Sequence, residues 1–253
     1  MESSCLFCQA IFKKKYKAQI YCSLRCSNRA NLNGKNNDVV LPRRYSSDLA
    51  EFVGILLGDG TVSTYFVKVY LNMIADKDYA KYVLRLSKKL FPKAAVTNRI
   101  DVKRGTTDIQ ISAKVVCDYL KRIGFKPKRK VVPRWIKNQK RFIKATLRGL
   151  FDTEGTIGFK YFDGKNGNYF YKQLTFTNSN NKLLRFVEKQ LEKLGYKPTK
   201  DSIKNIYLSN RKDVERYFKE IGSSNQKMIR KNHLERIGKY QYGGIGQLVA
   251  HRS

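Results

Sequence analysis

The chain has 253 residues, enough to bury a core as one large domain or two small ones. Lysine and arginine total 52 against 20 aspartate and glutamate, a formal charge of +32. So large an excess repels itself in a compact fold unless a polyanion is bound, and the basic residues are spread along the whole chain. We therefore expect a nucleic-acid partner and no membrane. No stretch approaches the ~18 apolar residues of a membrane span and the N-terminus lacks a signal pattern, so we expect an intracellular protein.

Four of the five cysteines lie near the N-terminus, with the spacing C-x2-C-x13-C-x3-C: Cys5, Cys8, Cys22 and Cys26. Two close pairs of thiolates suit tetrahedral zinc, and an intracellular chain keeps its cysteines reduced or metal-bound. The segment resembles small treble-clef or ribbon zinc modules with a CxxC…YCSxxC pattern. We predict a four-cysteine zinc module over residues 1–30, with a short hairpin over 9–21 and a helix over 27–32. Cys117 stands in an apolar setting and is expected in the core.

The polar residues 31–47 are expected to form a linker, and the chain beyond them repeats itself once. Helical and alternating periodicities predict the order α-β-β-α-β-β-α over 48–135 and again over 136–235, with a tail at 236–253. Asp48 and Glu51 have the spacing of a capping box at the start of the first helix. The fold class is therefore α+β, with two similar halves about a pseudo-twofold axis, an arrangement that suits a nucleic-acid duplex.

Both repeats open with related nine-residue peptides, FVGILLGDG at 52–60 and LRGLFDTEG at 147–155. Each peptide places two small residues four positions apart, on one helix face: Gly54 and Gly58, and Gly149 and Thr153. Small residues on one face let helix backbones approach closely, so we expect these positions to form an interface between two helices.

Each of these helices is expected to end on an acid, Asp59 or Glu154, with Gly60 or Gly155 as the left-handed residue that follows. The C-terminus of a helix carries partial negative charge, so two carboxylates brought together there repel each other. A shared divalent cation resolves that conflict, and hard oxygen ligands favour Mg2+ or a similar ion. Such a cation can support phosphodiester hydrolysis.

The two nonapeptides and the matching elements downstream resemble the LAGLIDADG homing endonucleases, over about residues 48–235. The resemblance implies a site-specific, Mg-dependent DNA endonuclease that makes a double-strand break in a long double-stranded target, in intron homing. It implies four-stranded sheets that form a saddle over the DNA, and Asp59 and Glu154 as catalytic metal ligands. A monomer is expected because both motifs lie in one chain. The zinc module lies outside the core family pattern; we interpret it as an additional DNA-contacting element, with a folding clamp as the alternative.

The same resemblance implies a basic residue late in each half, near the scissile phosphate. Candidates are Lys128, or else Lys126 or Lys130 beside it, and Lys227. The sixth motif position is Leu57 in one copy and Asp152 in the other, and that position does not bind the metal.

Polar residues alternate along the strands expected to read DNA, and period two places each set on one sheet face. The candidates for DNA binding are Lys68, Tyr70 and Asn72, with Tyr65 before them, and Lys160, Gln173, Thr175 and Thr177, with Tyr171 among them. Side chains of these types hydrogen-bond base edges or phosphates.

Three other functions use related scaffolds. An intron RNA maturase, with intron RNA as partner, and a DNA-binding regulator do not need both acids, so the intact pair favours the nuclease. An intein requires a splicing domain around the nuclease, for which we find no room between Met1 and Ser253. We expect the protein wherever its DNA is, in the cytoplasm or nucleoid, or in an organelle.

Overall fold

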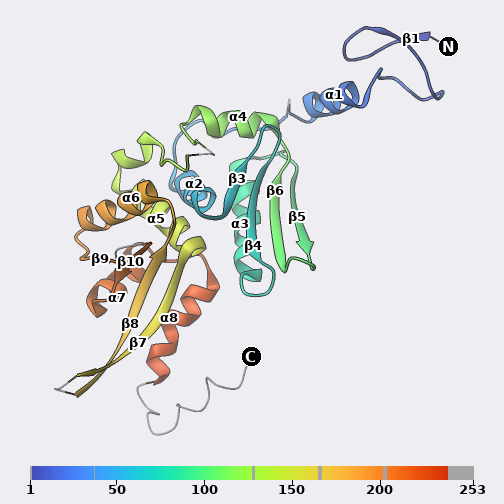
Figure 1. Ribbon diagram of the computed structural model, residues 1–253. Helices are drawn as coiled ribbons and strands as arrows, with labels where there is room; N and C mark the ends of the chain where they lie inside the picture. The colour runs from blue at the N-terminus through green and yellow to red at the C-terminus, as the bar shows by residue number, and fades with distance from the viewer. Residues whose placement is uncertain (1, 37, 127–128, 165–166, 202–203, 239–253) are drawn as a thin grey trace.

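A computed structural model describes residues 2–36, 38–126, 129–164, 167–201 and 204–238. Two halves with the same element order lie side by side, with the N-terminal module projecting near α4 (Figure 1). The first half contains α2 (Ser47–Asp59), β3 (Gly60–Val62), β4 (Val67–Asn72), α3 (Lys77–Leu90), β5 (Val96–Asp101), β6 (Thr106–Ile111) and α4 (Lys114–Arg122). The second contains α5 (Lys140–Glu154), β7 (Gly155–Gly164), β8 (Gly167–Thr177), α6 (Asn181–Lys193), β9 (Thr199–Lys200), β10 (Asn205–Leu208) and α7 (Arg211–Glu220). The 3-10 helix η1 (Arg134–Asn138) joins the halves, and α8 (Gln226–Gly238) follows them.

Each half is built on one antiparallel four-stranded sheet. The strand orders are β3-β4-β6-β5 and β7-β8-β10-β9, so the first, second, fourth and third strands of each half are neighbours in turn. The two sheets therefore have the same strand order, as a tandem repeat of one unit requires. The predicted α+β fold with two repeated halves is confirmed.

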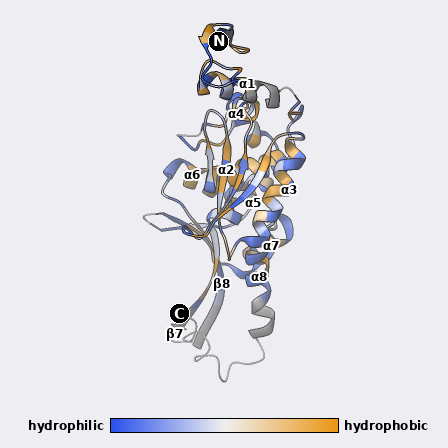
Figure 2. Cartoon of the chain, turned by 90° about the vertical axis from the view of Figure 1, so that its right-hand side faces the viewer, coloured by the Kyte–Doolittle hydropathy of each residue, from blue (hydrophilic) through white to orange (hydrophobic). Residues whose placement is uncertain are grey.

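The core lies between one face of each sheet and the helices that cover it. Strand β4 alternates between buried and more exposed positions, with Val67, Val69 and Leu71 inward. The amphipathic helices supply the other side of the core, for example through Val83 of α3 and Val187 of α6, both fully buried. In Figure 2 apolar residues gather around α2 in the middle of the molecule, while the outer helices carry mixed colour. One face of each sheet therefore stays polar and uncovered.

The N-terminal module differs from the prediction in two ways. Its hairpin joins β1 (Glu2–Ser4) to β2 (Ile11–Lys13), so the first cysteine pair lies in the turn, and the hairpin predicted over 9–21 is wrong. This turn brings the sulfur atoms of Cys5 and Cys8 within 4.8 Å of each other. Helix α1 (Leu24–Asn36) also continues through residues expected to form the linker.

One further local prediction is wrong. Ser46, not Asp48, caps α2, because its hydroxyl accepts from the Leu49 N–H at 3.1 Å. Helix α8 ends at Gly238, and the rest of the predicted tail, 239–253, lies outside the described residues. Among the residues that the structure describes, no helix is both long and apolar enough to cross a membrane.

Candidate functional site

The helices α2 and α5 touch along their small residues. A Cβ added to Gly54 would lie 3.2 Å from the Leu150 nitrogen, and one added to Gly149 would lie 2.9 Å from the Ile55 nitrogen. Thr146 donates across the interface to the Ala50 carbonyl at 3.1 Å. The structure thus places Gly54 and Gly149 where backbone meets backbone, and Gly58 opposite Thr153.

The glycines that follow α2 and α5 do not have the predicted backbone conformation. Gly60 and Gly155 have φ of −99° and −91°, so the predicted left-handed conformation is wrong for both. A Cβ on Gly60 would meet Leu56 of its own helix, and one on Gly155 would lie 3.0 Å from the Phe151 Cα. The chain turns directly from helix into strand at each point, and only glycine leaves room for that turn.

This turn sets the place of the two acids. Asp59 is the last residue of α2 and Glu154 the last of α5. A Cβ on Gly58 would lie 3.2 Å from the Glu154 Cγ, so the second acid lies directly against the end of the first helix. Asn178, after β8, donates to Glu154 Oε1 at 2.9 Å and fixes that carboxylate.

The electrostatics of the pair are unfavourable without a cation. Burial, followed by the charge of Glu154, raises the pKa of Asp59 to about 7. Burial also raises the pKa of Glu154, against the lowering effects of Lys130 and Asn178. Two half-buried carboxylates that resist ionisation are the donor set that a divalent cation stabilises. The carboxylate oxygens of the two acids fit such an ion in their chemistry.

Two lysines exert their positive charge on the acids. Lys130 donates to the Gly58 carbonyl at 2.6 Å, and its charge lowers the pKa of both Asp59 and Glu154. Lys227 pairs with Asp76 at 2.8 Å and also lowers the pKa of Asp59. Lys128 lies outside the described residues.

Asp152, at the sixth motif position, points into the protein. It accepts from the Ser223 hydroxyl and from the Ser224 N–H, the latter at 2.7 Å, and burial raises its pKa to about 7. Glu51, expected to serve a capping box, is fully buried instead, paired with Arg148 and bonded to Ser224 at 2.8 Å. Both acids therefore fasten the 223–225 segment to the motif helices.

The alternating residues of the first sheet lie on its uncovered face. Lys68 pairs with Asp108 at 3.8 Å and lies over the Tyr70 ring, 5.9 Å from its centroid. Tyr70 is 38% exposed. Asn72 accepts from the Ile74 N–H and so shapes the turn after β4, while Tyr65 falls in the β3–β4 turn.

The second sheet has the same arrangement. Lys160 is exposed and faces Tyr171 across the β7–β8 pair. Gln173 is nearly buried and donates to Ser209 at 2.7 Å. Thr175 and Thr177 continue the row, the latter donating to Asn205 at 2.6 Å. Several of these polar groups are therefore held by neighbours on the same face.

The four N-terminal cysteines converge. Their sulfur atoms all lie within 4.8 Å of one another, with 3.6 Å between Cys8 and Cys22 and 3.5 Å between Cys22 and Cys26. Tetrahedral zinc with bonds of about 2.3 Å needs sulfur atoms at about these separations. Among the described residues this cluster fits a zinc ion. Cys117 is buried in the core.

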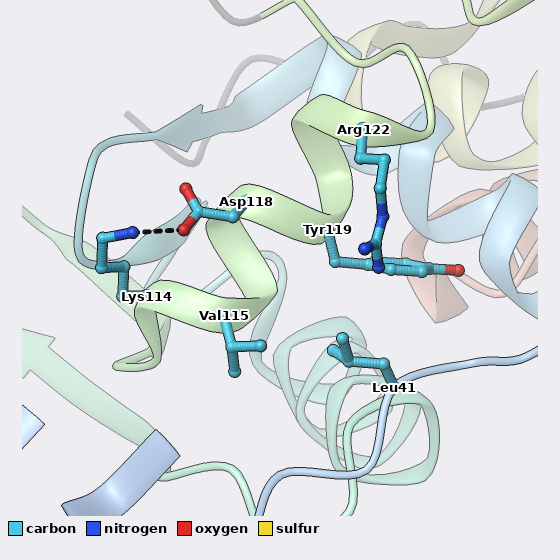
Figure 3. A pocket seen from close by; sticks show the side chains of 6 residues that line it. All are labelled: Leu41, Lys114, Val115, Asp118, Tyr119 and Arg122. Atoms are coloured by element: carbon cyan, nitrogen blue, oxygen red, sulfur yellow. Dashed lines mark hydrogen bonds and ion pairs between the residues drawn. The ribbon is translucent and has the colours of Figure 1, made fainter. Parts of the chain in front are cut away.

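A pocket of about 350 Å3 lies against α4, away from the acids (Figure 3). Leu41 from the segment before α2 faces Val115 and Tyr119 across it, and Lys114 pairs with Asp118 on the rim. The pocket marks where the 39–42 segment packs on α4.

Sequence reasoning missed Asn178 and Asp76. Both lie just beyond the second strand of their half, a region that the periodicity treats as a loop. Comparison of the two repeats at these loops was the available signal.

Sequence comparisons relate the chain to known proteins. The family model for a LAGLIDADG-like domain matches residues 141–222. The small subunit of replication factor C from Methanocaldococcus jannaschii is 27% identical over 194 residues, 74% of this chain and 10% of that protein. An A-type ATP synthase subunit of Pyrococcus horikoshii is 30% identical over 129 residues, 47% of this chain and 13% of that protein. The chain thus spans only a small part of these relatives.

Solved structures match across both halves. The LAGLIDADG meganuclease I-AabMI, bound to uncleaved DNA, has a TM-score of 0.54 at 11% identity, covering 77% of this chain and 91% of that one. A variant of I-DmoI with nicked target DNA and manganese has a TM-score of 0.50 at 17% identity, covering 71% and 98%. The body of the protein has the same two-half fold as these solved structures, and residues 141–222 match the model of a LAGLIDADG-like domain. The resemblance seen in the two nonapeptides is confirmed.

Proposed function

We propose that the protein is a site-specific DNA endonuclease that hydrolyses one phosphodiester bond in each strand of a long duplex target. The observation that carries this proposal is the pairing of Asp59 and Glu154. They end two touching helices, both have a raised pKa, and they are equivalent positions of a repeat. A structural role alone does not account for two half-buried acids at adjoining helix C-termini, where the charge of Glu154 also opposes ionisation of Asp59.

Asp59 and Glu154 would hold divalent metal, with Mg2+ favoured by their hard oxygen atoms. When bound, such an ion would supply the Lewis-acid chemistry that phosphodiester hydrolysis requires. The chain's own groups do the rest: Asn178 orients Glu154, and Lys130 and Lys227 bring positive charge to the phosphates. The I-DmoI variant of the same fold was solved in the presence of manganese.

The uncovered sheet faces would bind the target. Lysine and tyrosine side chains there suit phosphate and base contacts, and the charge of +32 supplies the nonspecific attraction. Because both motifs lie in one chain, the protein would act as a monomer, and cleavage at an intron insertion site would serve intron homing.

The N-terminal cysteine cluster would bind zinc and hold β1, β2 and α1 together. The module carries basic side chains and exposed apolar ones, including Leu6 at 71% and Tyr16 at 65%. We infer that it contacts DNA beside the main target.

The test is cleavage of a duplex that joins the sequences flanking the reading frame in its genome. Wild type with Mg2+ should cut both strands, and a chelator should stop it. Asp59→Asn should abolish double-strand cleavage while binding stays within about twofold, because the loss falls on the reaction rather than on affinity. Asp48→Asn is the matched control, since this acid lies on the same helix and pairs with Lys89 at the surface.

Full cleavage by Asp59→Asn would refute the assignment. Wild type that binds the duplex with Mg2+ but leaves it intact would favour the DNA-binding regulator. Wild type that instead promotes splicing of the intron RNA would favour the maturase.

A further inference from the structure

In each half, the N-cap residue of the amphipathic helix, α3 or α6, contacts a residue from the other half. Asp76 holds the N-cap position of α3 and Asn180 that of α6, so the two are equivalent. Asp76, in the first half, contacts Lys227 from the end of the second. Asn180, in the second half, donates to the Arg129 carbonyl at 3.3 Å. Arg129 precedes Lys130 near the end of the first half. The repeat thus uses one position twice to hold a basic segment against the acids.

The two copies differ in charge. Asn180 caps its helix by accepting from two N–H groups of the first turn. Asp76 turns its carboxylate elsewhere: Oδ1 accepts from Lys227 Nζ at 2.8 Å and from Asn225 Nδ2 at 3.1 Å, and Oδ2 accepts from the Asn72 N–H at 3.3 Å. Its side chain is 13% exposed and that of Lys227 is 34% exposed. The pair is therefore largely shielded from solvent, where charge pairing is stronger than at an open surface.

The segment that carries Lys227 is fixed on both sides. Asn225 is 1% exposed, donates to the Asp152 carbonyl at 3.0 Å, and accepts from the Lys227 N–H at 3.0 Å. It also donates to Asp76. The backbone of Lys227 is thus tied to the second motif helix, and its ammonium group to the first half.

The side chain of Asp76 does not make the helix cap that its counterpart makes. Asp76 forms no side-chain hydrogen bond to the first turn of α3, whereas Asn180 accepts from two N–H groups of α6. An asparagine at position 76 would suit a helix cap equally well. The carboxylate at this position instead forms the ion pair with Lys227.

We propose that Asp76 is a positioning residue that holds Lys227 near the acid-bearing end of the motif helices and thereby sets the cleavage rate of one DNA strand. The inference rests on the proposed nuclease function and deepens it. The other strand depends on Lys130, which is held by the neutral Gly58 carbonyl. Loss of Asp76 should therefore act on one strand alone.

The experiment measures the nicking rate of each strand, on the genomic duplex described above, labelled on either strand. Asp76→Asn should slow one strand by about tenfold or more, through misplacement of Lys227, and leave the other within about twofold. Lys227→Met should slow the same strand, and the double variant should be no slower than Lys227→Met. KM should stay near wild type while kcat falls.

Three measurements separate positioning from folding. Asp78→Asn is the matched control, because Asp78 lies in the first turn of the same helix and pairs with Arg230 at 3.6 Å rather than with Lys227. Asp76→Glu keeps the charge and should recover most of the rate, whereas a purely structural site would tolerate Asn better than Glu. Thermal melting should change little in Asp76→Asn.

Equal loss on both strands, or additive effects of Asp76→Asn and Lys227→Met, would overturn the proposal. So would unchanged nicking in Asp76→Asn. Wild type that cuts neither strand would instead remove the nuclease function itself, which is a separate result.

Discussion

At the scale of single residues, burial opposes the ionisation of Asp59 and Glu154. Burial and the neighbouring acid raise the pKa of Asp59 to about 7, so the folded protein holds this proton more tightly than the unfolded chain does. Between roughly pH 4 and 7 the unfolded state releases the proton first, and stability without metal falls as pH rises across that window. A divalent cation held by the two acids, as proposed above, would offset this cost.

The prediction is that Asp59→Asn, in chelator, melts at a higher temperature than wild type at pH 8. The gain should be about 1–2 kcal/mol, less than the full shift because the site is partly solvated, and it should vanish near pH 4. Added Mg2+ should stabilise wild type more than the variant. Circular dichroism melts at the two pH values measure this, and a variant no more stable than wild type at pH 8 would contradict it.

Single residues also mark where sequence reasoning stops. Asp59 and Glu154 were predictable because they recur at equivalent points of a repeat. Asp76 and Asn178 were not predictable, because each contacts a residue from another element: Asp76 contacts Lys227, and Asn178 contacts Glu154. Glu51 was misread for the same reason, since its partners Arg148 and Ser224 come from the other half.

At the scale of elements, the α2–α5 pair decides whether the two acids meet. At Gly149 an added methyl group would press on the Glu51 carbonyl and the Ile55 nitrogen, which are backbone atoms and cannot turn aside. The helices would have to separate, and the acids with them. Gly158 offers a contrast, because a Cβ there points into open space among the described residues.

Gly149→Ala should therefore destabilise the protein by about 1–3 kcal/mol through overpacking and sharply reduce cleavage. Gly158→Ala should leave the melting temperature near that of wild type. Melting curves and cleavage rates on the same preparations test the pair. If Gly149→Ala melted like Gly158→Ala, close packing of the helices would not be what holds the acids together.

Element order was predictable because buried faces impose periods of two and 3.6 along each strand and helix. Helix α8 was not, because its residues show little amphipathic pattern. It is anchored by particular contacts instead: Met228 is buried, and Lys172 donates to the Asn232 carbonyl at 2.7 Å. The hairpin around Cys5 and Cys8 was missed because its strands are only three residues each, too short to show side-chain alternation.

At the scale of the whole molecule, the net charge and the two-half symmetry both support the proposed DNA duplex as partner. Two similar halves present polar sheet faces, and the excess of positive charge covers the body and the N-terminal module alike. The module stands apart from the body near α4, so its contribution to binding should be separable from that of the sheets (Figure 1).

The contribution of the N-terminal module to DNA binding can be tested through its exposed lysines. Lys13, Lys15 and Lys17 are exposed on the module, and their replacement by alanine should weaken binding to a duplex with long flanks. If all three contact phosphates, the slope of log affinity against log salt should fall by about 2–3. Binding to a short duplex that covers only the central target should change little.

The matched control replaces three exposed lysines on the helical side of the body, Lys88, Lys189 and Lys193. It removes the same net charge, so any effect of charge at long range appears in both variants. A larger loss for the module variant, restricted to the long duplex, would place the module on flanking DNA. Equal losses in the two variants would mean that the cysteine cluster is a folding clamp without a DNA contact of its own.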